Sequence, residues 1–409
     1  MKVWLINHYA VPVKYYPLAR TTNFAKYLIR KGHEVTIFAA SSVHNSEINL
    51  IKNRILYREE WVNEIHYVLV HCKTYKGNGI DRIFNMFEFP WKLKKVCQCY
   101  ERPDVIMASS ATPPACMQGL RLAKKYGAGA IAEISDLWPE SFVAYHLLNK
   151  CNPLLKLMYL YEKRMYIYAD KLIFTMEGAY NYILKKGWDK KIDREKVFYI
   201  NNGIDLEQFC YNRAHFQIQD NDLNNHKLFK VVYVGSIRKV NNLGLLLDAA
   251  KLVQNPEIQF LIWGDGDELA MLKKRIRIEN INNVKFKGKV NKKYIPYITS
   301  SANLNFLHST DSEIFQFGIS ANKIFDYLAS GKPTLVDFDC PYNPIVQTGS
   351  GIALSSPNAE EIREAIIEFK NMEYHKYKIF CDNAAEAAKK FDFYNLTNQL
   401  EKILKESIW

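Results

Sequence analysis

The chain has 409 residues, of which 48% are hydrophobic and 24% are charged. This length predicts two domains, each large enough for its own core, and the composition excludes a disordered or fibrous protein. No run of about eighteen apolar residues occurs, and the apolar run at the N-terminus is too short for a signal peptide. We therefore expect a protein that neither spans a membrane nor carries a recognisable export signal.

The formal net charge of +12 is concentrated in the first half of the chain. Residues 1–205 hold 30 Lys/Arg and 19 Asp/Glu, whereas residues 206–409 hold 25 and 24. A basic half suggests an anionic partner, either nucleic acid, anionic lipid or an anionic substrate, although a solvated basic face has the same composition. The eight cysteines are scattered without metal-ligand spacing, which is typical of reduced thiols in a cytosolic protein.

The hydrophobic pattern of the first half alternates between strands and helices. A strand at 3–6, a helix at 20–30 and a strand at 35–39 form an opening βαβ unit, which predicts a parallel sheet. The later elements are strand 104–107, helix 120–126 closed by Gly127, and strands 130–134, 171–174 and 197–200. A turn-rich break over 201–205 separates this half from the next.

The second half repeats the same plan of strands and helices. Strands are expected at 229–234, 259–263, 284–286, 304–307 and 334–336, with a helix at 242–253. Gly235 follows the first of these strands, and Gly264 follows the second. Because doubly wound sheets bind ligands at the carboxyl ends of their strands, both glycines mark a candidate ligand site.

The most informative stretch, 316–333, reads Gln-Phe-Gly-Ile-Ser-Ala-Asn-Lys-Ile-Phe-Asp-Tyr-Leu-Ala-Ser-Gly-Lys-Pro. A loop leads into a short helix, which Gly331 and Pro333 end. The free backbone N–H groups at the start of this helix, with Lys323 in its first turn, suit a diphosphate. Asp326 can accept two hydroxyl hydrogen bonds, such as those of a ribose. From the residues alone, an ordinary helix capped by glycine remains the alternative.

This stretch resembles the donor-site motif of family 4 glycosyltransferases, which carry a Glu, seven residues and a second acidic residue. It is most similar to a bacterial branch that builds surface polysaccharides such as O-antigen and capsule. Asp326 stands at the second acidic place, which the resemblance assigns to the donor ribose. Gly318 stands where the first Glu would be, so the usual contact to the donor sugar ring is unassigned. Further stretches that resemble family motifs are Asp136-Leu137-Trp138-Pro139-Glu140, Asn202-Gly203-Ile204-Asp205 and Gly264-Asp265-Gly266.

The resemblance implies an α/β protein of the GT-B fold, with two Rossmann-like doubly wound domains facing a central cleft. An acceptor-binding domain is expected over 1–205, completed by a crossover helix over 393–409, and a donor-binding domain over 206–392. The implied reaction is retaining transfer of a hexosyl or N-acetylhexosaminyl group from a nucleotide-sugar, expected to be a UDP-sugar. The implied acceptor is a glycan linked to undecaprenyl diphosphate at the membrane. Neither a metal ion nor a cofactor is expected.

Glycosyl transfer requires that the leaving diphosphate be stabilised as its charge develops, which calls for cations and backbone N–H groups. Lys323 is one candidate cation. Arg238 is another, standing two positions from the Arg of many relatives, and a solvent-exposed loop Arg is its alternative interpretation. The donor-binding residues that we predict are Asp326, Asn322, Ser320, Gly318, Gly264, Gly235 and Ser236.

Asp136 follows the strand at 130–134 and is the predicted catalytic residue of the first half. It could orient the acceptor hydroxyl or accept its proton, and a helix N-cap is the alternative role. On the family's usual front-face mechanism, the leaving phosphate takes the proton. Asp136 then only positions the reacting groups and is not a nucleophile. The loop before the helix at 20–30 is bulky and basic instead of glycine-rich, and packing is its alternative role. Its predicted acceptor-binding residues are Tyr9, Lys14, Tyr15 and Arg20.

Residues 73–102 interleave aromatic and basic side chains, which suits an anionic bilayer surface. Pro90 should kink or split a helix here, and a core-packing helix with a wet basic face is the alternative. We expect the protein to lie on the inner face of the cytoplasmic membrane.

Two other classes remain weaker. A nucleic-acid binder would explain the charge, but no recognisable nucleic-acid module occurs. A GT-B sugar-nucleotide epimerase would share the nucleotide site but needs further acid/base carboxylates.

Overall fold

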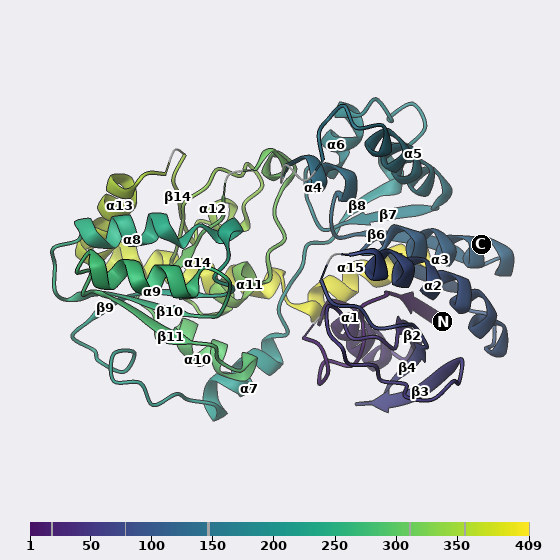
Figure 1. Cartoon of the computed structure of the whole chain (residues 1–409), viewed down its shortest axis with the longest axis horizontal. Helices are drawn as coiled ribbons and strands as arrows, with labels where there is room; N and C mark the ends of the chain where they lie inside the picture. The colour runs from purple at the N-terminus through teal and green to yellow at the C-terminus, as the bar shows by residue number, and fades with distance from the viewer. Residues whose placement is uncertain (18, 78, 145–147, 311, 356, 409) are drawn as a thin grey trace. The chain divides into compact units, whose positions relative to one another are not determined.

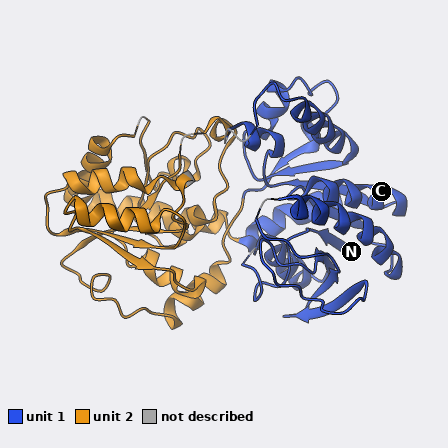
Figure 2. Ribbon diagram, in the orientation of Figure 1, with its two compact units in different colours: residues 1–201, 393–409 blue, residues 202–392 orange. Residues whose placement is uncertain are grey.

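The computed structural model describes residues 1–17, 19–77, 79–144, 148–310, 312–355 and 357–408. The chain divides into two compact units, Met1–Asn201 with Phe393–Trp409, and Asn202–Asp392 (Figure 2). The division falls at the start of the turn-rich break. None of the helices within the described ranges is both long and apolar enough to cross a membrane.

The first unit is built on an eight-stranded sheet with the order β3-β4-β2-β1-β5-β6-β7-β8. Every neighbouring pair is parallel except β3 and β4, which form an antiparallel pair at one edge. The strands are β1 (Lys2–Ile6), β2 (Glu34–Ala40), β3 (Tyr57–Val62), β4 (Ile65–Val70), β5 (Val105–Ser109), β6 (Gly129–Ile134), β7 (Lys171–Phe174) and β8 (Val197–Tyr199). The central strands are buried on both faces, as parallel strands between helical layers are expected to be.

The helices of the first unit connect successive strands and cover the sheet (Figure 1). They are α1 (Arg20–Arg30), α2 (Ile80–Val96), α3 (Pro113–Tyr126), α4 (Trp138–Ala144), α5 (Pro153–Tyr168), α6 (Ala179–Lys185) and α15 (Phe393–Lys405), with short 3-10 turns at Cys97–Cys99 and Arg194–Lys196. Helix α15 comes from the far end of the chain. Its apolar face joins the core that α1 forms with the sheet, and Phe393 and Phe24 meet edge to face at 5.3 Å.

The second unit has a six-stranded parallel sheet with the order β11-β10-β9-β12-β13-β14. The strands are β9 (Phe229–Val234), β10 (Ile258–Trp263), β11 (Val284–Gly288), β12 (Leu304–Leu307), β13 (Thr334–Val336) and β14 (Gly351–Ala353). The helices are α7 (Leu206–His215), α8 (Leu243–Leu252), α9 (Leu269–Ile278), α10 (Ile295–Ser300), α11 (Asn322–Ala329), α12 (Pro344–Gln347), α13 (Ala359–Asn371) and α14 (Tyr374–Lys390). Short 3-10 turns occur at Lys239–Asn241, Lys292–Tyr294 and Glu313–Phe317.

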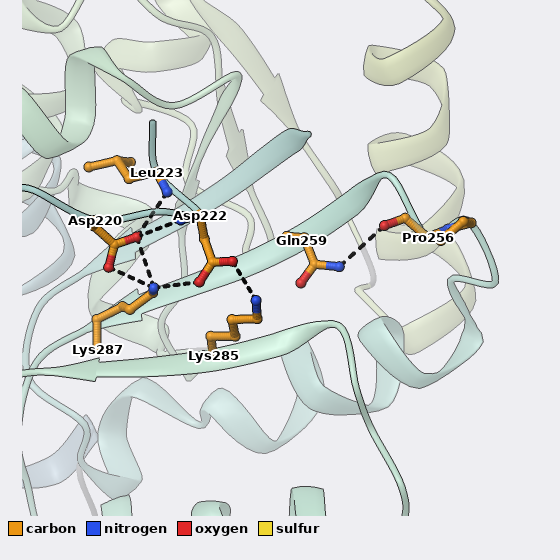
Figure 3. Close-up of polar contacts among 7 residues, drawn as sticks. All are labelled: Asp220, Asp222, Leu223, Pro256, Gln259, Lys285 and Lys287. Atoms are coloured by element: carbon orange, nitrogen blue, oxygen red, sulfur yellow. Dashed lines mark hydrogen bonds and ion pairs between the residues drawn. The ribbon is translucent and has the colours of Figure 1, made fainter. Parts of the chain in front are cut away.

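A cluster of ion pairs ties the loop before β9 to the edge strand β11 (Figure 3). The Lys287 ammonium lies 2.7 Å from a carboxylate oxygen of Asp220 and 2.7 Å from one of Asp222, and Lys285 also pairs with Asp222. These pairs hold the pKa of Asp222 below its usual value, against the effect of burial. Charged side chains on an edge strand also discourage pairing with other chains.

Three local expectations are corrected by the structure. Helix α3 begins at Pro113, seven residues before the expected start, because two prolines suit a first helical turn. Helix α2 is continuous through Pro90, so the expected split is wrong; burial of Met86, Phe89 and Leu93 packs the helix on both sides of the proline. The antiparallel β3–β4 pair was not anticipated, because alternating exposure along β3 interrupts its apolar pattern.

Candidate functional site

The strand order of the second unit reverses between β9 and β12, where open α/β sheets characteristically bind ligands. At the carboxyl ends of neighbouring strands, Gly264 follows β10, Gly235 follows β9, His308 follows β12 and Asp337 follows β13. The predicted donor residues Gly235 and Gly264 therefore lie at the edge of the sheet where a ligand is expected.

The loops after β9 and β10 are packed against each other so closely that only glycine fits. A Cβ atom on Gly264, whose φ is 154°, would lie 1.8 Å from the carbonyl oxygen of Gly235. A Cβ atom on Gly266 would lie 2.0 Å from the carbonyl oxygen of Ile237. The Ile237 amide also donates a hydrogen bond of 2.9 Å to the Asp265 carbonyl. The glycines thus bring two backbone loops together at the strand ends.

Helix α11 places the predicted donor motif at the same edge. Gly318 has a φ of 116°, a conformation that residues with side chains rarely adopt. The backbone geometry therefore explains why no Glu stands at this place. Ser320 accepts a 3.3 Å hydrogen bond from the Asn202 amide, and Asn322 accepts one from the Asn202 side chain.

Lys323, in the first turn of α11, lies over the end of β9. Its ammonium donates a 3.1 Å hydrogen bond to the Tyr233 hydroxyl and sits 4.5 Å from the centre of that ring. The Tyr233 hydroxyl donates onward to the Ser236 carbonyl at 2.8 Å. A Cβ atom on Gly235 would lie 3.1 Å from the Lys323 ammonium. Burial lowers the pKa of Lys323 to about 8, and the charge of Asp337 opposes this shift.

Asp326, one turn further along α11, is half-buried. Burial raises its pKa to about 6, and Lys292 acts in the opposite direction. Within the described part of the chain, no group donates a hydrogen bond to this carboxylate. A half-buried carboxylate with unused acceptor capacity can bind hydroxyl groups of a ligand.

The other predicted cation, Arg238, is exposed and precedes the 3-10 turn Lys239–Asn241. Asn241 donates hydrogen bonds of 2.7 and 2.8 Å to the carbonyl and hydroxyl oxygens of Ser236. The structure therefore brings Lys323, Gly235, Ser236 and Gly264 together, whereas the Arg238 side chain makes no hydrogen bond or ion pair with any residue that the structure describes.

In the first unit, Asp136 follows β6 and precedes α4. Helix α4 begins at Trp138, so Leu137 occupies the N-cap position and the alternative role of Asp136 as N-cap is not supported. No described residue hydrogen-bonds to the Asp136 carboxylate. Its side chain is exposed, so the desolvation that raises its pKa is partial.

The predicted acceptor-binding residues have different surroundings. Tyr9 is buried, with its ring centre 4.4 Å from that of His44. Lys14 and Tyr15 are exposed, and both reach Glu60, at 2.7 and 3.3 Å.

Arg20 is buried in a structural role. Its guanidinium donates to Glu133 at 2.8 Å and to the carbonyls of Asn201 and Ile200 at 2.6 and 3.0 Å. These three bonds use three of the five N–H donors of the guanidinium and fix its position.

His308 and Asp337 were missed by sequence reasoning. Both are almost fully buried, and the His308 Nδ1 is hydrogen-bonded to a carboxylate oxygen of Asp337. They stand 29 residues apart, outside the motif, so only the pairing of β12 with β13 brings them together. A polar residue directly after a buried strand was the one available signal. Among the described residues, no group of three or more His, Cys, Asp or Glu side chains has an arrangement suited to a metal ion.

Two protein families match the chain in succession. The family described as Glycosyltransferase Family 4 matches residues 19–208, and the family described as Glycosyl transferases group 1 matches residues 216–391. The two matches correspond closely to the two sheets with their helices. No curated protein sequence matches this chain.

Solved structures similar to this chain extend over nearly its whole length. HepE of Anabaena, in complex with UDP and glucose, has 16% identity and a TM-score of 0.66, covering 99% of this chain and 100% of that one. Sucrose-phosphate synthase of Thermosynechococcus elongatus has 14% identity and a TM-score of 0.71, with coverage of 99% and 98%. A glycosyltransferase of Rickettsia africae has 15% identity and a TM-score of 0.67, with coverage of 99% and 98%. At these identities the likeness establishes the fold, which is GT-B.

Proposed function

We propose, given that the chain belongs to family 4 of the retaining, nucleotide-sugar-dependent glycosyltransferases, that its second unit binds a UDP-sugar. The observation that carries this proposal is the half-buried Asp326 carboxylate, which lacks a hydrogen-bond donor among the described residues. Two vicinal hydroxyls of a ribose would supply the two donors that it can accept. The UDP bound to the similar HepE supports the choice of nucleotide.

The diphosphate is assigned to the start of α11 and the end of β9. Lys323 supplies a cation, and the first turn of α11 supplies backbone N–H groups that favour negative charge. Arg238 is exposed three residues after Gly235, and its long side chain can approach the same phosphates. These groups stabilise the leaving diphosphate as its charge develops, which is the main requirement for glycosyl transfer.

Asp136 is assigned to the acceptor side of the reaction. Its exposed carboxylate, free of contacts to described residues, can hold the acceptor hydroxyl beside the anomeric carbon. Retention then follows from attack on the same face that the diphosphate leaves, with a phosphate oxygen taking the hydroxyl proton.

Calorimetric titration of UDP tests the donor site. Asp326→Asn should weaken UDP binding at least about tenfold, because a charged acceptor of two hydroxyl hydrogen bonds is lost. Asp382→Asn is the matched control, since Asp382 is an exposed carboxylate on α14 that pairs with Lys378. Equal affinities for the two variants would contradict the assignment. Incubation with a UDP-sugar alone gives a second check, because conversion to an epimer would contradict transfer.

We further propose that the acceptor is lipid-linked, as a glycan of bacterial surface-polysaccharide synthesis would be, and that the first unit docks on an anionic membrane. Helix α2 carries an exposed apolar stripe, and α5 carries a second. The exposed apolar residues are Ile80, Ile83, Phe84, Phe87 and Trp91 on α2, and Leu154, Leu157, Leu160 and Ile167 on α5. Both helices pack against α3, so the two stripes belong to one helical layer.

Basic side chains flank both stripes, which adds attraction to anionic lipid. On α2 the Lys95 ammonium lies 4.4 Å from the centre of the Trp91 ring, and Lys94 is exposed. Lys92, in contrast, is held by Glu88 and by the His71 carbonyl, at 2.6 and 2.9 Å. The charges expected to meet the membrane are therefore Lys94 and Lys95.

Co-sedimentation with vesicles that contain phosphatidylglycerol tests this docking. Changing Phe84 and Trp91 together to Gln should reduce the bound fraction severely, and added salt should reduce it for the wild type. The control changes the exposed Tyr374 on α14 of the second unit to Gln. If the wild-type protein stays in the supernatant at low salt, membrane docking is contradicted. The two stripes would then be a surface for another kind of partner.

A further inference from the structure

Two tyrosine hydroxyls lie at the carboxyl end of β9, around Gly235. Tyr233 is on β9 itself and Tyr327 is on α11, and both side chains are almost completely buried. The Tyr327 hydroxyl accepts a 3.2 Å hydrogen bond from the Val234 amide. The Tyr233 hydroxyl donates one of 2.8 Å to the Ser236 carbonyl. The backbone is therefore fixed directly before and directly after Gly235.

Tyr327 has a structural explanation. The pairing of β9 with β12 stops at Val232 and Asn305, before either strand ends. Beyond that point the Tyr327 hydroxyl also donates a 3.2 Å hydrogen bond to the Phe306 carbonyl, so it bridges the two strands where their own pairing stops. Because unpaired backbone groups are costly to bury, this hydroxyl serves the stability of the sheet.

The backbone alone does not explain the Tyr233 hydroxyl. The Ser236 carbonyl also accepts a 2.7 Å hydrogen bond from the Asn241 side chain, so it does not depend on Tyr233. The second partner of the Tyr233 hydroxyl is the Lys323 ammonium, which donates a 3.1 Å hydrogen bond to it. The same ammonium lies 4.5 Å from the centre of the Tyr233 ring, where the negative face of the ring attracts it. One tyrosine therefore holds this ammonium in two ways.

The charge of Lys323, which is half-buried, is held without a carboxylate. Among the residues that the structure describes, none forms an ion pair with its ammonium. Lys186 in the first unit differs, since its ammonium lies 3.9 Å from the centre of the Tyr159 ring but also 2.6 Å from a carboxylate oxygen of Glu140. An ammonium held by a ring and a hydroxyl keeps its positive charge available, which suits an anionic ligand.

Gly235 provides the space for this arrangement. A Cβ atom at Gly235 would lie 3.1 Å from the Lys323 ammonium and 3.1 Å from the Tyr233 hydroxyl oxygen. Both groups therefore lie over the glycine at the strand end, at the edge to which the diphosphate is assigned. Because an ammonium has three N–H donors, the bond to Tyr233 leaves two for phosphate oxygens.

We propose that Tyr233 is a positioning residue for the donor diphosphate, because it holds the Lys323 ammonium over Gly235 before a nucleotide binds. The proposal rests on the assignment of Lys323 to the donor diphosphate. A free lysine side chain loses considerable conformational entropy when a ligand fixes it. A lysine already held by Tyr233 loses less entropy on binding, so the diphosphate binds more tightly.

Calorimetric titration of the full chain with UDP tests this role. Tyr233→Phe removes the hydroxyl and keeps the ring, so it should weaken UDP binding about tenfold. Uridine has no phosphate, so in ligand-observed NMR its affinity for the variant should stay within about twofold of its affinity for the wild type. An unchanged UDP affinity in Tyr233→Phe, or an equal loss of affinity for uridine, would overturn the proposal.

Tyr377→Phe is the matched control. The Tyr377 hydroxyl donates a 2.7 Å hydrogen bond to the carbonyl of Asn303, which precedes β12 at the opposite end of the same sheet. This variant also loses one hydroxyl bonded to a backbone carbonyl, but it should bind UDP as the wild type does. A loss equal to that of Tyr233→Phe would make the effect a general one and would overturn the proposal.

The Lys323→Ala background shows whether Tyr233 acts through the lysine. In that background Tyr233→Phe should have no further effect on UDP affinity, since the group that it positions is absent. An equal loss in both backgrounds would overturn the proposal, because Tyr233 would then act independently of Lys323.

The same variants separate this proposal from the function on which it rests. If Lys323→Ala weakens UDP binding but Tyr233→Phe does not, the donor assignment stands and the positioning role is overturned. If Lys323→Ala binds UDP as the wild type does, the assignment of Lys323 fails, and the positioning role fails with it. A wild-type protein that does not bind UDP would overturn both.

Discussion

At the scale of single residues, glycines shape the predicted donor site of the second unit as much as side chains do. Gly318 adopts a φ of 116° at the place where the family motif has a Glu. Gly264 allows the backbones after β9 and β10 to approach each other. Substitution of such glycines distorts the site through the backbone, not through a lost contact.

We predict that Gly264→Ala is strongly destabilising. Its Cβ atom would meet the Gly235 carbonyl oxygen at 1.8 Å, and its φ of 154° is strained for alanine. The free energy of unfolding in urea should fall by about 2–4 kcal/mol. Gly32→Ala is the control, because Gly32 has a φ of 82° but nothing within 4 Å of an added Cβ, so about 1 kcal/mol of strain is expected. Similar losses in both variants would rule out the clash.

A second prediction at this scale concerns Asp136. Asp136→Asn should lower turnover about 100-fold, the loss expected when a reacting group is no longer held in place, and leave UDP affinity unchanged. Asn keeps the shape and can hydrogen-bond, so the comparison isolates the charge. Turnover within a few-fold of the wild type would exclude a role for the charge in transfer, and weakened UDP binding would move Asp136 to the donor side.

At the scale of elements, α5 combines an exposed apolar stripe with a buried carboxyl on its opposite side. Glu162 accepts hydrogen bonds from the hydroxyls of Tyr166 and Tyr182 at 2.6 and 2.7 Å. Burial raises the pKa of Glu162 to about 7, although both tyrosines act to lower it. The contact between α5 and α6 therefore depends on the protonation state of one group.

This arrangement predicts a pH dependence of stability. The folded-state pKa of Glu162 lies above the unfolded value near 4.5, so its contribution to stability is fully present below that value. The contribution is lost as the pH rises towards about 7, at up to about 1.4 kcal/mol per pH unit. Glu162→Gln should flatten this slope in urea unfolding between pH 5 and 8. Glu195→Gln, an exposed control, should keep it; an unchanged slope in Glu162→Gln would contradict the prediction.

At the scale of the whole molecule, the first unit depends on the last helix of the chain. Helix α15 supplies Phe393, Leu396, Leu400, Ile403 and Leu404 to a core whose other buried members come from the first 200 residues. Glu401 adds ion pairs with Lys405 and Lys31 and a hydrogen bond with His33, and these contacts hold its pKa at about 2. The first unit is therefore completed only after the second has been synthesised.

We predict that Leu400→Ala destabilises the first unit by about 2–4 kcal/mol, as other buried Leu→Ala changes do. Leu400 is fully buried, whereas Lys402 on the same helix is exposed, so Lys402→Ala should change stability by less than about 0.5 kcal/mol. Hydrogen exchange should localise the effect of Leu400→Ala to α1 and β1. If Leu400→Ala instead reduced protection from hydrogen exchange only in the second unit, the assignment of α15 to the core of the first unit would be wrong.

The sequence alone determined the class of fold and most of its elements. Apolar runs with glycine and proline stops located β1, β2, β9, β10 and α1 within one or two residues, because buried parallel strands and capped helices depend on local patterns. The motif around Asp326 indicated family 4, and the matched families confirm it. The polysaccharide branch, the acceptor and the site roles stay predictions.

Tertiary structure decided what local pattern could not. Nothing in the local pattern indicated that Arg20 hydrogen-bonds to Glu133 and to two backbone carbonyls, because those partners stand more than 100 residues away. The pattern likewise left His308 and Asp337 as unrelated residues until β12 and β13 paired. Local sequence sets backbone preference and burial. The neighbours of a buried charge are set by strand order, and they decide whether that charge is structural or available for chemistry.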